Sequence, residues 1–169
     1  MLDVASIRKD FPIYNKGNSP LIYLDSASTT QKPQSVIDTI TSYYDSYTAN
    51  IHRALYTIGE KATDEYEKVR EKVKLFLNVP DTHSIIFTGG TTESINLVSH
   101  AWGTKFLDKK NNVIVSEMEH HSNLVPWQMV TEQTGASLKF IPLADDGTLN
   151  LKELDSYFSP NTKLMSLVH

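Results

Sequence analysis

The chain has 169 residues, of which 40% are hydrophobic and 21% charged, a composition that favours a globular core over disordered or fibrous classes. Its net charge of -4, with scattered Lys and Arg, argues against nucleic-acid binding, and no apolar run approaches the roughly 20 residues of a membrane helix. Cysteine is absent, which excludes disulfides, thiolate metal ligands and a cysteine nucleophile within these residues. Because the start also lacks an apolar signal core, we expect a cytoplasmic protein that binds neither nucleic acid nor membrane.

The first half of the sequence predicts one short extended segment and two helices. Residues 21–24 form a brief apolar run, which reads as a first strand and is followed by a polar loop at 25–30. Apolar residues recur at helical spacing over 33–47, where Pro33 can open the helix, and this stripe is expected to be core. A second amphipathic helix is expected from about residue 57 to residue 77.

From residue 84 onward, short apolar strands alternate with helical patterns. The expected strands are 85–87, 113–115, 138–143 and 164–168, and the expected helices are 91–107, 124–134, closed by Gly135, and a short one capped by Asn150 that runs to residue 157. Such alternation implies right-handed crossovers and an α/β fold: a mainly parallel sheet with helices on both faces. No repeat or linker marks a domain boundary within 1–169. The last strand runs up to His169, which leads us to expect an incomplete domain with an unsatisfied sheet edge.

Residues 87–96 are the most informative stretch, because a strand there breaks at two glycines and opens directly into a helix. Glycine at Gly90 lets a ligand approach the backbone closely, and the first N–H groups of a helix attract anions. The hydroxyls of Thr91 and Thr92 add donors, so a phosphate fits this loop, with hydrogen bonds rather than the helix dipole carrying most of the affinity. A simple helix cap after a tight turn is an equal alternative, because the pattern matches neither the P-loop nor the dinucleotide fingerprint.

A second polar stretch, residues 116–123, follows the expected strand at 113–115. Ligands of open α/β sheets bind at the carboxyl ends of strands, so both polar stretches face one crevice if their strands are near neighbours. Adjacent histidines on a strand point to opposite faces, and we therefore expect no metal at His120 and its neighbour. A lone loop histidine is most often structural. Residues 50–53 are likewise either a substrate loop or an ordinary turn.

Five sequence blocks, in order, resemble the SUF-type cysteine desulfurases, relatives of the class V aminotransferases. The blocks are YLDSASTTQKP at 23–33, NIHRALYTIGEKATDEYEKVR at 50–70, TGGTTESINLV at 88–98, SEMEHHSNLVPWQ at 116–128 and DDGTLNL at 145–151. The resemblance covers almost the whole chain and less than half of such an enzyme. It implies fold type I of the pyridoxal 5'-phosphate proteins, here an N-terminal segment plus the first part of the large cofactor-binding domain, with a small C-terminal domain absent from these residues and a homodimer as the whole enzyme.

The resemblance also implies roles for particular residues. Cofactor-binding positions are Gly90, Thr91, Thr92, Asn96 and His120, and substrate-facing positions are Ala27, His52 and Arg53. His120 is implied to stack on the pyridine ring and to assist proton transfer, which makes it the catalytic candidate of this chain. The chain departs from the common family pattern at four positions, which are Ser26, Ala54, Tyr56 and Gly89.

The implied reaction converts L-cysteine to L-alanine and passes the sulfur to an enzyme cysteine as a persulfide, for delivery to an acceptor protein of the SUF system and for iron–sulfur cluster assembly. In the family, the lysine that binds the cofactor, the partner of the pyridinium nitrogen and the acceptor cysteine all follow the position of His169. These 169 residues alone are therefore expected to be inactive. The alternatives are a selenocysteine lyase, another class V pyridoxal-phosphate enzyme, and a truncated chain without catalysis.

Overall fold

The computed structural model describes residues 2–16 and 21–168. His169, up to which the last strand was expected to run, lies outside the described residues. The chain divides into two compact units, one ending at Ile85 and the other beginning at Ile86. Within the described residues no helix is both long and apolar enough to cross a membrane.

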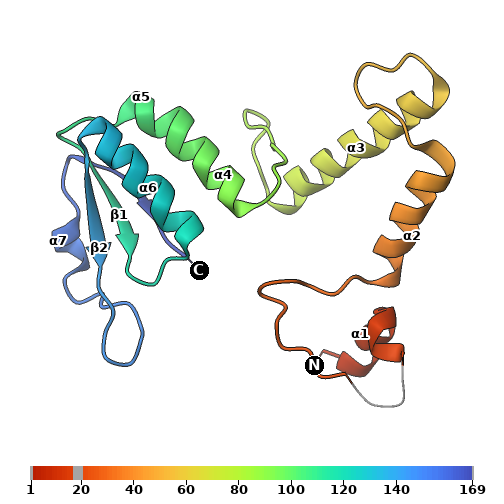
Figure 1. Ribbon diagram of the computed structural model, residues 1–169, viewed down its shortest axis with the longest axis horizontal. Helices are drawn as coiled ribbons and strands as arrows, with labels where there is room; N and C mark the ends of the chain where they lie inside the picture. Colours follow the sequence, from red (N-terminus) through yellow and green to blue (C-terminus); the bar gives the residue numbers. More distant parts are fainter. Residues whose placement is uncertain (1, 17–20, 169) are drawn as a thin grey trace. The chain divides into compact units, whose positions relative to one another are not determined.

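The first unit consists of helices (Figure 1). They are α1 (Val4–Lys9), the 3₁₀ turn η1 (Pro12–Asn15), α2 (Gln34–Ser42), the π turn η2 (Tyr43–Tyr47) and α3 (Thr57–Phe76). The helix predicted over 33–47 is confirmed as α2 followed by η2, and the one predicted over 57–77 as α3. Residues 21–24 do not form the expected strand, and the carbonyl of Leu21 accepts a hydrogen bond from the Arg8 guanidinium at 3.1 Å.

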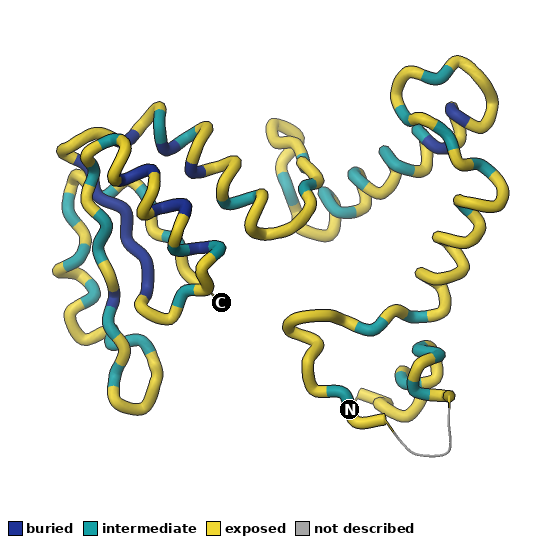
Figure 2. Tube along the Cα trace, viewed as in Figure 1, coloured by how far each residue is buried: buried dark blue, intermediate teal, exposed yellow. Residues whose placement is uncertain are grey.

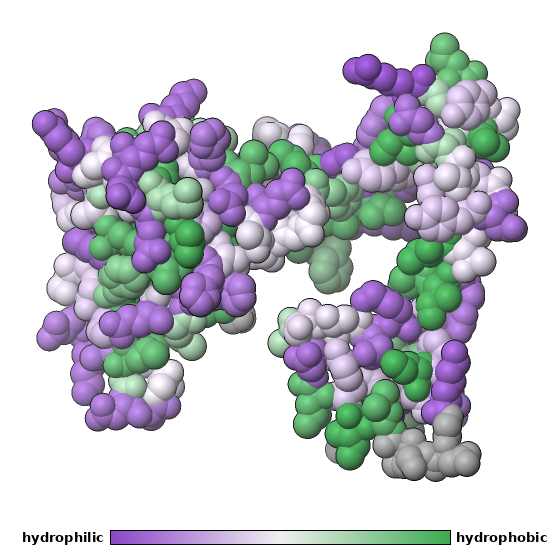
Figure 3. Space-filling view, viewed as in Figure 1, coloured by the Kyte–Doolittle hydropathy of each residue, from purple (hydrophilic) through white to green (hydrophobic). Residues whose placement is uncertain are grey.

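The apolar stripe of α2, which we expected to be core, is largely open to solvent. Ile37 is 39% exposed and Ile40 is 52% exposed. Among the described residues of the first unit only Gly59 and Ala62 are buried. Figure 2 shows the helices of this unit as mostly exposed, and hydrophobic side chains lie open on them in Figure 3. Helical spacing of apolar residues fixes which side of a helix is apolar, and burial of that side requires a second surface. The prediction of a buried stripe is wrong for this unit.

The second unit is a parallel α/β sheet with its helices (Figure 1). Its elements are α4 (Thr91–Val98), the π turn η3 (Ser99–Gly103), α5 (Thr104–Phe106), β1 (Asn112–Ser116), α6 (His121–Thr134), β2 (Ser137–Ile141), α7 (Leu154–Tyr157) and β3 (Thr162–Ser166). The strand order is β2-β1-β3, and both neighbours run parallel to β1. This confirms the predicted α/β class with a parallel sheet.

Alternation along β1 places helices on both sides of the sheet. Val113 and Val115 are fully buried and pack against Trp127 on one face of the sheet, with Leu107, Val130 and other apolar side chains around them. Lys139 of β2 pairs with Ile114 and therefore points to the other face of the sheet. There its ammonium donates to the carbonyl of Tyr157, the last residue of α7, at 3.0 Å. Since side chains alternate between the faces of a strand, α6 and α7 cover opposite faces.

Two local predictions from residue 85 onward are wrong. Residues 85–87 are not a strand, and the Ile85 carbonyl accepts from the Arg70 guanidinium instead of joining a ladder. Asn150 does not cap the short helix, because its side chain accepts from the Lys152 N–H, and α7 begins later, at Leu154. Both segments have the composition of the predicted element, but in each a side-chain hydrogen bond holds a different local arrangement.

Candidate functional site

The start of α4 is shaped by Gly90, the N-cap residue, with φ 153° and ψ 179°. Essentially only glycine adopts this backbone region. The turn before it is held by short-range bonds: the Thr88 hydroxyl donates to the Gly90 carbonyl at 3.1 Å, and the Glu93 carboxylate accepts from the Gly89 N–H at 2.5 Å. The turn is therefore closed by its own residues, while the helix start beyond it has no side-chain cap.

The residues at this helix start fit a phosphate group. The first N–H groups of a helix have no intrahelical acceptor, and the dipole places partial positive charge there. Thr91 and Thr92 are exposed and supply hydroxyl donors, and a Cβ added at Gly90 would meet no protein atom within 4 Å. Backbone donors, hydroxyls and open space thus meet at one point, which is the arrangement that binds an anion.

His120 lies at the carboxyl side of β1, where it caps α6. Its Nδ1 accepts a hydrogen bond from the Ser122 N–H at 3.1 Å and lies 2.8 Å from the Ser122 hydroxyl. Histidine is outside the residues usually preferred as N-caps, so the sequence does not predict this capping role for His120. The cap fixes where its ring stands relative to the helix.

Thr92, Asn96 and His120 line one hollow of about 300 Å³ on the second unit, together with residues 121, 122, 125 and 126. A second hollow of about 200 Å³ is lined by Thr91 and again by His120, with residues from the end of β3. The two predicted polar stretches therefore meet at the imidazole of His120. The amide of Asn96 is partly engaged by its own helix, because its Nδ2 donates to the Thr92 carbonyl at 2.8 Å.

The carboxylate of Glu119, the residue before His120, holds three chain segments together. One oxygen accepts from the Ser116 hydroxyl at 2.5 Å and from the Val168 N–H at 2.9 Å, and the other accepts from the Asn123 amide at 2.7 Å. Burial raises the pKa of Glu119, but the bonds from Ser116, Asn123 and Val168 together outweigh it and hold the pKa below the ordinary 4.5. The charged form is therefore the one this network stabilises.

Asn123 extends that network into the core. Its Oδ1 accepts from the Trp127 indole N–H at 3.0 Å and from the Ser166 hydroxyl at 2.5 Å. Sequence analysis missed the structural roles of Glu119, Ser122 and Asn123. The available signal was local, a polar run ending on an expected helix start, but partners such as Ser166 are 43 residues away in the sequence.

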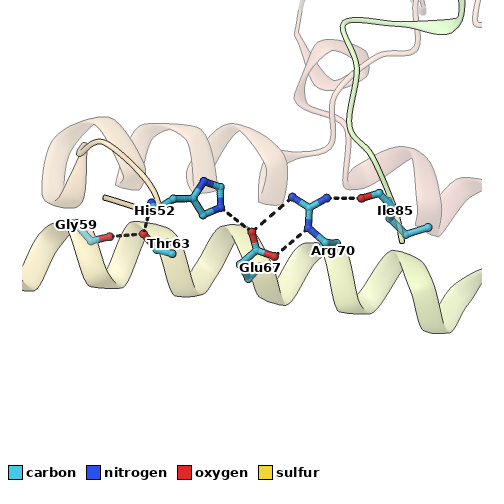
Figure 4. A network of polar contacts seen from close by, with 6 residues as sticks. All are labelled: His52, Gly59, Thr63, Glu67, Arg70 and Ile85. Atoms are coloured by element: carbon cyan, nitrogen blue, oxygen red, sulfur yellow. Dashed lines mark hydrogen bonds and ion pairs between the residues drawn. The ribbon is translucent and has the colours of Figure 1, made fainter. Parts of the chain in front are cut away.

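The predicted substrate residues belong to the first unit. His52 has a left-handed backbone, φ 72°, and its N–H donates to the Thr63 hydroxyl at 2.9 Å. Its Nε2 lies 2.8 Å from the Glu67 carboxylate, which also accepts from Arg70 Nε at 2.9 Å (Figure 4). The hydrogen bond from Arg70 and then that from His52 lower the pKa of Glu67. His52 is therefore tied to α3 as part of a polar network.

Ala27 and Arg53 are exposed, Ala27 in a turn in which the Asp25 carbonyl accepts from the Ser28 and Thr29 N–H groups. No group of three or more His, Cys, Asp or Glu side chains suited to a metal occurs in residues 2–16 and 21–168. The positions of Ala27, His52 and Arg53 are described within the first unit only, and their substrate roles stay predictions.

Comparison of the sequence with known protein families identifies the family of this chain. Residues 22–169 match the aminotransferase class-V family. The chain belongs to the class V aminotransferase family. Its predicted resemblance to cysteine desulfurases is confirmed by curated relatives. It is 46% identical, over all of its length, to a probable cysteine desulfurase of Mycolicibacterium paratuberculosis, and 42% identical, over 99% of its length, to one of Halalkalibacterium halodurans.

Solved structures of cysteine desulfurases agree with this class V chain in fold. It superposes on the Escherichia coli enzyme CsdA with a TM-score of 0.80 and 36% identity over 98% of its length, and on the apo enzyme of Thermococcus onnurineus with a TM-score of 0.87 and 32% identity over 99%. The chain spans 41% and 40% of those two structures, and 25% and 42% of the two curated relatives.

We predict that Gly90→Ala destabilises the start of α4 by about 1–3 kcal/mol, the cost of a non-glycine residue in this backbone region. Steric overlap contributes nothing, since the added Cβ has open space around it. Amide hydrogen exchange over residues 91–98 measures the change in the full polypeptide that the gene encodes. Exchange rates in Gly90→Ala equal to those of the wild type would contradict the prediction. Gly89→Ala is not a neutral control, because its Cβ would come within 2.8 Å of the Glu93 carboxylate that closes the turn.

Proposed function

We propose that this chain carries the phosphate-binding loop and the ring-facing histidine of a pyridoxal 5'-phosphate-dependent cysteine desulfurase. The observation that carries the proposal is the meeting of the uncapped α4 start with His120: Thr92 and His120 line one hollow, and Thr91 and His120 line the next. Identity of 42–46% to probable cysteine desulfurases supports the choice of reaction.

Within this proposal the chain's own residues bind and orient. The N–H groups of the α4 start and the hydroxyls of Thr91 and Thr92 hold the phosphate, with Gly90 leaving room for it. With the cofactor bound, the imidazole of His120 would stack on the pyridine ring and assist proton transfer there as a donor, and Asn96 lines the same hollow. The cofactor supplies an electron sink for the amino-acid substrate.

For the whole protein we propose the conversion of L-cysteine to L-alanine. The carbon–sulfur bond breaks, the sulfur joins the thiol of an enzyme cysteine outside these residues as a persulfide, and the carbon takes up the proton that the thiol loses. Ala27, His52 and Arg53 are proposed to face the substrate. We further propose that the chain forms the first part of the large domain of a cytoplasmic homodimer and that the sulfur goes to a SUF-type acceptor protein for iron–sulfur cluster assembly.

The test measures pyridoxal 5'-phosphate binding and alanine release from L-cysteine with the full polypeptide that the gene encodes. We expect stoichiometric cofactor and alanine production. Thr92→Val should weaken cofactor affinity about 10- to 100-fold, because it removes one hydrogen bond to a charged group, worth about 1.5–3 kcal/mol. Thr104→Val is the control, since the Thr104 hydroxyl donates to the His100 carbonyl within its own helical turn.

Three outcomes separate the alternatives. Cofactor binding with faster release of alanine from selenocysteine than from cysteine indicates a selenocysteine lyase. Cofactor binding without release of sulfur or selenium indicates another class V activity. The absence of cofactor binding contradicts the proposal and leaves a non-catalytic chain.

A further inference from the structure

The hydrogen bond between His120 and the start of α6 determines which nitrogen of the imidazole carries a proton. The backbone N–H of Ser122 donates to Nδ1 at 3.1 Å, and the Ser122 hydroxyl lies 2.8 Å from the same atom. A backbone N–H can only donate, so the lone pair of Nδ1 must face it. A proton on Nδ1 would point at the Ser122 proton and break the cap.

The neutral imidazole has one N–H and one lone pair. With the lone pair of Nδ1 engaged by Ser122, the ring proton sits on Nε2. His120 lies on both hollows next to the α4 start, so this assignment decides what the imidazole offers to a bound molecule: a hydrogen-bond donor at Nε2, and no free lone pair. In histidine sites generally, the hydrogen bond that one ring nitrogen makes decides whether the other carries the proton.

We propose that Ser122 is a positioning residue whose backbone N–H fixes His120 as the neutral Nε2–H tautomer, so that His120 meets its ligand as a hydrogen-bond donor and not as a base. The proposal rests on the proposed function for the identity of the ligand, but the tautomer itself is a property of the protein alone. The side chain of Ser122 is secondary, since the backbone group suffices for the cap.

The geometry allows a sharp test, because α6 begins at His121 and Ser122 is its second residue. Ser122→Pro removes the N–H that caps Nδ1, in a first turn where the N–H has no helical acceptor. His121→Pro is the matched control: it places proline at the first helical position, after a residue that is already extended, and it keeps the Ser122 N–H. Ser122→Ala removes only the hydroxyl.

The measurement is a two-bond ¹H–¹⁵N correlation spectrum of the histidine rings in the full polypeptide without cofactor, recorded in alkaline buffer, with the His120 signals assigned from His120→Asn. We expect the Nε2–H pattern to dominate to the same extent in the wild type, in Ser122→Ala and in His121→Pro. Ser122→Pro should lower the ratio of Nε2–H to Nδ1–H about fivefold, the equivalent of one hydrogen bond of about 1 kcal/mol.

An Nδ1–H pattern in the wild type overturns the proposal, and this outcome needs no variant to fold. Equal tautomer ratios in Ser122→Pro and His121→Pro also overturn it. Because the spectra are recorded without cofactor, a failure to bind pyridoxal 5'-phosphate would contradict the proposed function and leave the tautomer result standing.

Discussion

Trp127→Ala should destabilise the second unit by about 3–5 kcal/mol, the usual cost of deleting a buried aromatic ring. Trp127 is 2% exposed and packs against Val113 and Val115 of β1, with Leu107 and Val130 beside it. Its indole N–H also donates to Asn123, so the substitution opens a cavity and leaves a buried acceptor with one donor fewer. Hydrogen exchange of the β1 amides, in the full polypeptide, measures the loss of opening free energy.

Trp127→Phe separates the two contributions. It keeps most of the ring volume and removes the indole N–H, while the Asn123 Oδ1 retains its bond from the Ser166 hydroxyl at 2.5 Å. We expect this variant to destabilise the second unit by about 1–2 kcal/mol, because one hydrogen bond is lost and the core repacks slightly. A loss in Trp127→Ala no larger than that in Trp127→Phe would contradict the placement of this ring in the core.

The second unit was predictable in most of its elements because its local signals agree. The run Val113 to Val115 is apolar and β-branched, β1 is buried along its whole length, and the helix after it ends at Gly135 in a left-handed conformation, φ 75°. The meeting of 87–96 with 116–123 followed from the rule for ligand sites in open sheets. That meeting occurs although 85–87 is not a strand, because α4 packs against α6 directly.

The apolar patterns of the first unit predicted its helices and not their environment. Ile40 recurs at the right spacing and is 52% exposed, and Phe76 at the end of α3 is 88% exposed. Spacing is a property of the helix itself, whereas burial depends on a surface that the pattern does not specify. The π turns at Tyr43–Tyr47 and Ser99–Gly103 were also not predicted, because one extra residue per turn leaves no compositional mark.

In the site, the residues expected from a helix start were predictable, and those held by distant partners were not. Thr91 and Thr92 follow directly from a glycine turn before a helix. Glu119 gave no such signal, because its partner Val168 is 49 residues away and the bond forms only when β3 lies beside β1. Glu119 is thus a structural acceptor at the end of the sheet.

Glu119→Ala should cost about 2–4 kcal/mol of stability in the second unit. The substitution leaves the buried Ser116 hydroxyl and the buried Asn123 amide without their carboxylate acceptor, at about 1–3 kcal/mol each and less where water enters from the adjoining hollow. The Val168 N–H also loses its acceptor, but this residue is exposed and water can replace the bond. Exchange of the Val168 amide should accelerate most. Glu117→Ala is the control, because its exposed carboxylate accepts one bond, from the Leu143 N–H.

The same carboxylate predicts a dependence on pH. The folded-state pKa of Glu119 lies below the ordinary 4.5, so its contribution is fully present above that value and is lost as the pH falls through the lower, folded-state value. The difference in stability between the wild type and Glu119→Ala should therefore be constant near neutral pH and shrink on the acid side of 4.5. A difference that stays constant into that acid range would show that the three donors are held by something other than the charge on Glu119.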